Sequence, residues 1–272
     1  MKKLFLTDLD GTLLRTDERI SDYSSNIINQ FIENGGLFSY ATARSFVTAS
    51  KVTGGLNITL PVICHNGVFI IEGTTKKLLL SNYFTSDDVS NISEILNAYS
   101  IYPIVFAEVN GKERFSYIDK FVTPAMKHFL NSRIGDPRIR EVSSSKELYI
   151  GNVFNCACMD TEETLNPIYE ILYTNRNYNC IYQKDIYSGT QWCEIYPVNA
   201  SKANATIQLK TLLECDKIIV FGDGRNDISL FSIADEKYAV ANAVPELKEV
   251  ATAVIESNDN DGVAKWIATH AS

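Results

Sequence analysis

Two aspartates separated by one residue stand near the start of the chain, where a short apolar run gives way to a glycine. The run Leu4 to Leu6 predicts a buried strand. Because positions i and i+2 of a strand point to one face, Asp8 and Asp10 are expected to project together where it ends. Gly11 allows the chain to turn away sharply. Two such charges repel each other unless a cation lies between them or one takes up a proton. The pattern therefore favours a metal-assisted nucleophile over a solvated strand end that closes in an Asx turn.

A second acidic group, Gly222-Asp223-Gly224-Arg225-Asn226-Asp227, follows an apolar strand predicted at Lys217 to Phe221. Carboxylate oxygens are ligands that Mg²⁺ prefers. Asp223 is therefore a candidate oxygen donor to the same cation. Taken alone, the segment would equally fit a glycine-rich turn that caps a helix.

Two further side chains could bind an anion. Thr42 follows the strand predicted at residues 37–41, and Lys202 stands in the first turn of the helix predicted at residues 201–213. A lysine there opposes the helix dipole, which is easier to explain if an anion binds at the same place. The alternatives are a hydroxyl that caps the following helix and a solvated surface lysine.

Strands alternate with helices at both ends of the chain, which predicts a parallel sheet with right-handed crossovers. The third strand is expected at Pro61 to Cys64, and the alternation resumes at Trp192 to Tyr196. A functional site is expected beyond the carboxyl ends of the strands. Between them, helices and hairpins indicate an inserted α+β domain, including a turn at Asn110-Gly111. We therefore expect a core of residues 1–83 and 188–272 and an inserted domain of residues 84–187.

The 272 residues carry a formal net charge of −8, and 45% of them are hydrophobic. This composition can bury the core of one or two domains. The acidic balance argues against a nucleic-acid groove and against an anionic membrane surface. No run reaches the ~20 apolar residues of a membrane span. The sequence shows no signal peptide, so we expect the reducing cytoplasm.

The cysteines and histidines show no metal-ligand spacing. None of the six cysteines forms a CxxC pair. Cys156 and Cys158 lie in an apolar run, which predicts buried thiols more readily than a metal site. The histidines are expected to be structural or to lie on the surface: His65, His128 and His270.

The segment Asp8-Leu9-Asp10-Gly11-Thr12-Leu13-Leu14 resembles the first motif, DxDGT, of phosphatases in the haloacid dehalogenase superfamily. The other three motifs follow in order, and the inserted domain falls between the second and the third. That placement and the segment from Asn258 to Val263 are most similar to the Cof-type subfamily, IIB. The resemblance implies an α/β fold, with a Rossmann-like parallel-sheet core and an inserted α+β cap. It also implies Mg²⁺ and a small phosphomonoester substrate such as a sugar phosphate.

The resemblance assigns roles to individual residues. Asp8 would attack phosphorus to form an aspartyl-phosphate, and Asp10 would be the general acid and base. The metal would be held by the carboxylates of Asp8 and Asp223 and the backbone carbonyl of Asp10, with support from Asp227. The residues expected to contact phosphate are Leu9, Thr42, Ala43, Lys202 and Asn226.

The chain departs from the family pattern at two places and leaves other roles open. The family often has glycine where Ala43 and Ala203 stand. Arg44 and Arg225 could contact substrate or face solvent. Turn roles are expected for a third set, Asn66-Gly67, Asn258 and Asp261-Gly262. Open candidates for substrate choice are Tyr102, Tyr117 and Tyr187, although aromatic residues on strands more often lie in a core.

Two other functions stay open at this point. A phosphomutase would return the phosphoryl group to its substrate instead of passing it to water. A ligand-binding or regulatory protein could keep the fold without turnover. The sequence leaves the oligomeric state undetermined.

Overall fold

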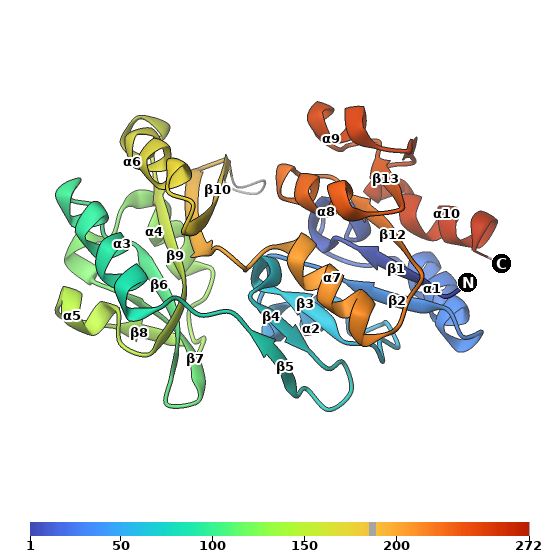
Figure 1. Cartoon of the computed structure of the whole chain (residues 1–272), viewed down its shortest axis with the longest axis horizontal. Helices are drawn as coiled ribbons and strands as arrows, with labels where there is room; N and C mark the ends of the chain where they lie inside the picture. The colour runs from blue at the N-terminus through green and yellow to red at the C-terminus, as the bar shows by residue number, and fades with distance from the viewer. Residues whose placement is uncertain (185–188, 272) are drawn as a thin grey trace. The chain divides into compact units, whose positions relative to one another are not determined.

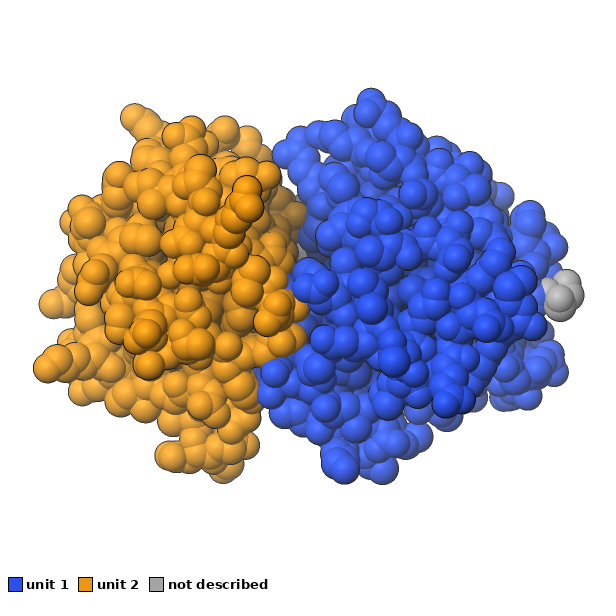
Figure 2. Space-filling view, in the orientation of Figure 1, with its two compact units in different colours: residues 1–81, 200–272 blue, residues 82–199 orange. Residues whose placement is uncertain are grey.

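A computed structural model describes residues 1–184 and 189–271, which form two compact units (Figure 2). Unit 1 combines both ends of the chain, Met1–Ser81 and Ala200–Ser272, and unit 2 is the continuous segment Asn82–Asn199. The inserted segment therefore begins at residue 82 and ends at residue 199, whereas the sequence suggested residues 84 and 187. The expected boundary between residues 187 and 188 lies outside the described residues, as does Tyr187.

Unit 1 is built on a five-stranded sheet in the order β14-β13-β12-β1-β2, and every neighbouring pair of strands is parallel (Figure 1). This confirms the predicted parallel-sheet core. Its strands are β1 (Lys3–Thr7), β2 (Leu37–Tyr40), β12 (Lys217–Gly222), β13 (Glu236–Val240) and β14 (Ala253–Ile255). Leu4 and Leu6 of β1 are fully buried. An apolar run that is buried on both faces is typical of a central parallel strand.

Helices connect these strands and supply the rest of the core. They are α1 (Asp22–Glu33), α2 (Phe46–Val52), α7 (Lys202–Leu212), α8 (Ile228–Ile233), α9 (Pro245–Val250) and α10 (Gly262–His270). α1 lies against α10, and α7 lies against α8. Ser201 ends the loop before α7, where its hydroxyl accepts the Asn204 backbone N–H at 3.0 Å. This N-cap fixes where α7 begins.

The strand expected third in the parallel sheet belongs to a separate antiparallel sheet of β3 (Val62–Cys64), β4 (Phe69–Ile71) and β5 (Leu78–Ser81). Only one parallel bridge, Ala41 to Ile63, connects β3 to the end of β2 among the described residues. The turn His65–Gly67 follows β3, and its three residues all have positive φ angles, of 49°, 53° and 97°. This turn reverses the chain, so β4 pairs with β3 in the antiparallel sense.

Unit 2 is an α+β domain around a six-stranded sheet in the order β10-β11-β9-β6-β7-β8. Its strands are β6 (Ile104–Val109), β7 (Lys112–Tyr117), β8 (Ile139–Glu141), β9 (Asn152–Asp160), β10 (Tyr178–Lys184) and β11 (Gln191–Pro197). Its helices are α3 (Ser86–Ala98), α4 (Pro124–Asn131), α5 (Ser145–Leu148) and α6 (Glu162–Thr174). The hairpin predicted at Asn110-Gly111 is confirmed between β6 and β7.

β11 corrects the expectation that Trp192 to Tyr196 belongs to the core. This strand pairs with β9 and β10 in unit 2. Local periodicity identifies a strand, but it contains no information about which strands are its partners. The sequence therefore predicted the strand and placed it in the wrong sheet.

The buried-thiol interpretation holds for unit 2. Cys156, Cys158 and Cys193 all lie in its hydrophobic core. Burial raises the pKa of the Cys156 thiol. Tyr102 stacks on Phe121 beside the same core, with 3.5 Å between ring centroids. Among the described residues, no helix is both long enough and apolar enough to span a membrane.

Candidate active site

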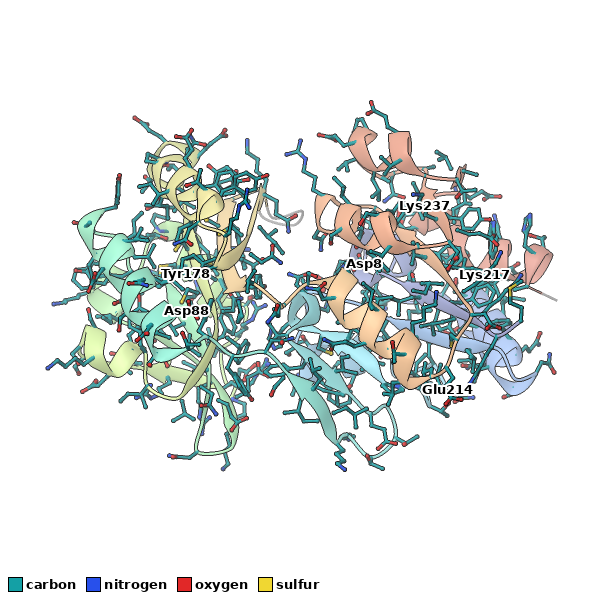
Figure 3. All side chains as sticks on the ribbon, in the orientation of Figure 1. Asp8, Asp88, Tyr178, Glu214, Lys217 and Lys237 are labelled. Carbon is teal, nitrogen blue, oxygen red and sulfur yellow. The ribbon has the colours of Figure 1, made fainter. Side chains whose placement is uncertain are left out.

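The site lies at the carboxyl ends of β1 and β12, which are adjacent and parallel. Thr7 at the end of β1 is in register with Phe221 of β12, and the backbone N–H of Asp8 donates to the Phe221 carbonyl at 3.0 Å. Figure 3 labels Asp8 in unit 1, where β1 ends. Asp223 directly follows β12. Register therefore brings together two acids that are 215 positions apart in the sequence.

Three carboxylates form one cluster. Oxygen atoms of Asp8, Asp223 and Asp227 all lie within 4.8 Å of one another. Gly11 lies against this cluster, since a Cβ atom placed on it would stand 2.4 Å from Oδ2 of Asp223. Any other residue there would displace Asp223. The oxygen donors and their close spacing fit Mg²⁺, which binds through a few carboxylates and retains several waters.

Hydrogen bonds orient the two acids that come from the second acidic segment. Thr12 Oγ1 donates to Asp223 Oδ1 at 3.0 Å. Oδ2 of Asp227 accepts the backbone N–H groups of Asp223 and Gly224, both at 3.1 Å. Asp227 is fully buried. Its carboxylate therefore fixes the loop from residue 223 to 227 and also belongs to the acid cluster.

Lys202 is the buried cation of the site. It is the first residue of α7, and only 1% of it is exposed. Its Nζ atom lies 2.5 Å from Asp8 Oδ1 and 2.7 Å from Asp227 Oδ1. Two carboxylates of the chain therefore lie at this helix terminus, and the predicted contact of Lys202 with phosphate stays a prediction.

Burial and like charges shift the protonation of these groups. Burial raises the pKa of Asp8 well above its ordinary value, Lys202 opposes that shift, and Asp227 adds to it. Burial, together with the charge of Asp227, raises the pKa of Asp223 to about 7. Burial alone would lower the pKa of Lys202, but Asp227 and Asp8 raise it above its ordinary value. The lysine therefore stays charged.

Asp10 does not share the carboxylate cluster. Its two oxygens accept hydrogen bonds from Arg44, from Nε at 2.8 Å and from Nη2 at 2.5 Å. Arg44 also pairs with Glu18 at 2.7 Å. The spacing predicted that Asp8 and Asp10 project from one face of a strand. That reason is wrong, because β1 ends at Thr7 and Asp10 lies in the following turn, Leu9–Leu13. The resemblance assigned the backbone carbonyl of Asp10 to the metal, and that assignment stays a prediction.

The segment around Thr42 forms a bonded loop between β2 and α2. Thr42 is fully buried, and its Oγ1 accepts the backbone N–H of Arg44 at 3.1 Å. The Thr42 carbonyl accepts the backbone N–H of Asn66 at 2.9 Å. Ala43 between them is exposed. Ala43 stands where the family often has glycine. Hydrogen bonds of Thr42 and Arg44, its two neighbours, hold the loop on both sides of it.

Asn66, which the sequence assigned only to a turn, connects the loops that carry Thr42 and Asn226. It does have a positive φ of 53°, and its Oδ1 also lies 3.4 Å from the Nδ2 of Asn226. The next residue, Gly67, lies against the first turn of α7, since a Cβ atom on it would stand 2.2 Å from the Ser201 carbonyl oxygen. Its position just after β3 could have indicated this role from the sequence, because functional side chains tend to follow the carboxyl ends of strands.

The other flanking residues have structural partners. Arg225 pairs at the surface with Glu246 at 2.6 Å. Asp261 has a positive φ, as expected of a turn, and its carboxylate pairs with Arg15 at 2.6 Å. Leu9 is fully buried in the core. The structure therefore brings Lys202 and the three clustered acids together, and places Thr42 and Asn226 in loops joined through Asn66.

The family model of haloacid dehalogenase-like hydrolases matches residues 5–267. The 5-amino-6-(5-phospho-D-ribitylamino)uracil phosphatase YitU of Bacillus subtilis is 24% identical over 281 residues, covering 99% of this chain and 97% of its own. The phosphatase YwtE of the same organism, which carries the same substrate in its name, is 26% identical and covers 97% and 96%.

A solved structure shares the fold. A haloacid dehalogenase-like hydrolase from Bacteroides thetaiotaomicron superposes with a TM-score of 0.80 at 23% identity, covering 99% of each chain. The family model matches nearly the whole sequence, including both acidic motifs and the lysine. The chain therefore belongs to the haloacid dehalogenase-like hydrolases.

Proposed function

We propose that this protein is a magnesium-dependent phosphatase that hydrolyses a small phosphomonoester, of the sugar-phosphate class, through an aspartyl-phosphate. Membership of a hydrolase family and relatives named as phosphatases support a phosphoric monoester hydrolase. The observation that carries the proposal is the cluster of Asp8, Asp223 and Asp227, two of which, Asp8 and Asp227, pair with the buried Lys202. The YitU and YwtE names specify a phosphorylated ribityl compound, which supports a small phosphorylated metabolite as the partner.

Asp8 is the nucleophile in this proposal. A carboxylate nucleophile divides phosphate-ester hydrolysis into two easier steps. Its approach to an anionic phosphate requires that the negative charges be offset, and Lys202 already lies 2.5 Å from Asp8 Oδ1. Mg²⁺, held by Asp8, Asp223 and the Asp10 carbonyl with support from Asp227, would supply the remaining positive charge and orient the phosphate.

Asp10 acts as the general acid and base. It would give a proton to the leaving alcohol and later take one from the attacking water. Arg44 fixes the plane of this carboxylate, because one guanidinium donates to both of its oxygens. Phosphate contacts are assigned to the Lys202 and Asn226 side chains, to the Thr42 hydroxyl, and to the backbone at Leu9 and Ala43.

Unit 2 is the cap of this chain in the proposal and determines substrate choice. Its residues 82–199 are inserted between the second and third motifs, as in the capped members of the family. The compartment expected from the sequence, the reducing cytoplasm, stays a prediction. It is supported by six cysteines that all carry free thiols.

The test is a screen of phosphorylated metabolites with Mg²⁺, scored for released inorganic phosphate. Asp8→Asn should lower the turnover rate on the order of 10³-fold or more, because the amide is not a nucleophile. The circular dichroism spectrum and melting temperature should stay close to those of the wild type. Wild-type rates in this variant would overturn the assignment of Asp8, and phosphate release that is linear in time would exclude a mutase as the main activity.

A further inference from the structure

Asn242 connects two parts of unit 1 that are far apart in the sequence. It lies in the loop between β13 and α9, and its Nδ2 donates to the Gly11 carbonyl at 2.7 Å. Its Oδ1 accepts the backbone N–H of Asn258 at 3.1 Å. Asn258 in turn donates through Nδ2 to the Leu14 carbonyl at 3.0 Å. This pair of asparagines therefore holds the turn Leu9–Leu13 at its middle residue, Gly11, and at Leu14, which follows it.

The same loop is bonded to the second acidic segment. The backbone N–H of Val244, two residues after Asn242, donates to the Asp223 carbonyl at 2.9 Å. Gly11, which Asn242 holds, is the residue whose Cβ position is 2.4 Å from Asp223 Oδ2. One short loop therefore fixes Gly11 and Asp223 against each other.

Hydrogen bonds made outside the acid cluster can oppose the repulsion among its carboxylates. Carboxylates within 4.8 Å of one another repel, and the repulsion tends to separate the segments that carry them. The ammonium of Lys202 contacts Asp8 and Asp227, whereas Asp223 accepts from Thr12. A bond made outside the cluster can hold Asp223 in place without neutralising it.

We infer that Asn242 is a positioning residue for the cation site, which holds Gly11 against Asp223 and so keeps the acidic ligands at binding distance. This inference rests on the proposed function, since it concerns the affinity for the proposed Mg²⁺. Outer-shell partners of this kind typically change metal affinity about tenfold to a hundredfold. Asn242 itself is exposed, so water can replace its hydrogen bonds at small cost to the fold.

The decisive variant is Asn242→Asp, studied in the full chain. It keeps the acceptor for Asn258 and loses the donor to Gly11. An added carboxylate should tighten cation binding by charge alone, so weaker binding has a positional cause. Calorimetric titration with Mg²⁺ alone should give a dissociation constant about tenfold above that of the wild type. Asn242→Leu, which adds no charge, should weaken Mg²⁺ binding at least as much.

Asn260→Asp is the matched control, because Asn260 is also an exposed asparagine and lies two residues after Asn258, the partner of Asn242. It should leave Mg²⁺ affinity unchanged or slightly tighter. The melting temperatures of the metal-free Asn242 variants should stay within about 3 °C of the wild type. Their kcat at saturating Mg²⁺ should be retained, while the Mg²⁺ concentration for half-maximal rate rises.

Wild-type Mg²⁺ affinity in Asn242→Leu, which loses the donor to Gly11 and adds no charge, would overturn the inference and leave the proposed function intact. A large fall in the metal-free melting temperature, together with a kcat that excess Mg²⁺ does not restore, would also overturn it in favour of a general structural role. A wild-type chain that binds no Mg²⁺ would overturn the proposed metal dependence and the inference with it.

Discussion

Lys202 and the three acids around it show how the charges of single residues define the site. One ammonium and three carboxylates lie together, and of these Lys202, Asp8 and Asp227 are buried while Asp223 is partly exposed. If all four are ionised, two negative charges are left over, which a divalent cation would balance. The raised pKa values of Asp8 and Asp223 are the alternative response to the same excess, because protonation also removes negative charge.

Lys202→Ala should lower the rate on the order of 10²–10³-fold, because it removes a cation that faces the developing charge on phosphate. It should also lower the free energy of unfolding by about 3–5 kcal/mol, since it leaves buried carboxylates without their partner. Steady-state kinetics and urea unfolding measure the two effects. Lys210→Ala is the control on the same helix, because Lys210 pairs only at 3.7 Å with a half-exposed Asp235. Equal effects of the two substitutions would contradict the role of Lys202.

The raised pKa of Asp223 predicts opposite pH dependences with and without metal. Burial raises this pKa from 3.8 to about 7, so between these values the folded protein binds more protons than the unfolded chain. In EDTA, the contribution of Asp223 to stability is therefore full below about pH 4 and is lost as pH rises through about 7.

Binding of Mg²⁺ requires the ionised carboxylate, so the gain in melting temperature on adding Mg²⁺ should grow as pH rises from about 5 to about 8. Thermal melts at each pH, with EDTA and with Mg²⁺, measure both trends. A Mg²⁺-induced gain that is larger at the acidic end of this range than at the alkaline end would contradict this assignment of Asp223.

At the scale of elements, the site depends on how closely the turn His65–Gly67 meets the start of α7. Gly67 has a φ of 97°, and a Cβ atom there would stand 2.2 Å from the backbone oxygen of Ser201. Since Ser201 caps α7 and Lys202 follows it, any displacement of this contact moves the lysine.

Gly67→Ala should therefore destabilise the protein and lower kcat/KM. Gly35→Ala is the matched control, because Gly35 also has a positive φ, 87°, but nothing lies within 4 Å of its Cβ position. The control should lose about 1 kcal/mol from backbone strain alone and keep its activity. Chemical unfolding and kinetics of both variants test this, and equal losses of activity would show that the contact with Ser201 has no effect on the site.

At the scale of the whole molecule, the chain builds two units that have separate hydrophobic cores. The core of unit 2 contains residues from α3, α6 and four strands, and all of them belong to one continuous segment. A continuous segment that has its own core can in principle fold alone.

The segment Asn82–Asn199, produced alone, should fold and unfold cooperatively. Its core and all six strands of its sheet come from within the segment. Circular dichroism and thermal unfolding measure this, and a shorter segment that ends at residue 187 is the matched control. The shorter segment lacks β11, the strand between β9 and β10, so it should not unfold cooperatively. If the shorter segment also unfolded cooperatively, that result would contradict the boundary at residue 199.

The sequence alone determined the features that depend on neighbouring residues. An apolar run followed by Asp8 predicted a strand that ends in an acid, and Asp223 after Phe221 and Gly222 did so again. Alternation of strands and helices predicted the parallel core, which the structure confirms. The carboxyl ends of parallel strands share one edge, which predicted the place of the site, and the family resemblance predicted that Asp8 and Asp223 would meet there.

Only the tertiary structure decided which distant groups meet in detail. It placed β11 in unit 2, Arg44 on Asp10, and Asn242 on Gly11, a partner 231 positions away. The periodicity of hydrophobic residues predicts whether a segment is buried, but it does not predict which other segment packs against it. A hydrogen bond between such distant positions depends on how all the intervening elements pack, so no local pattern specifies it.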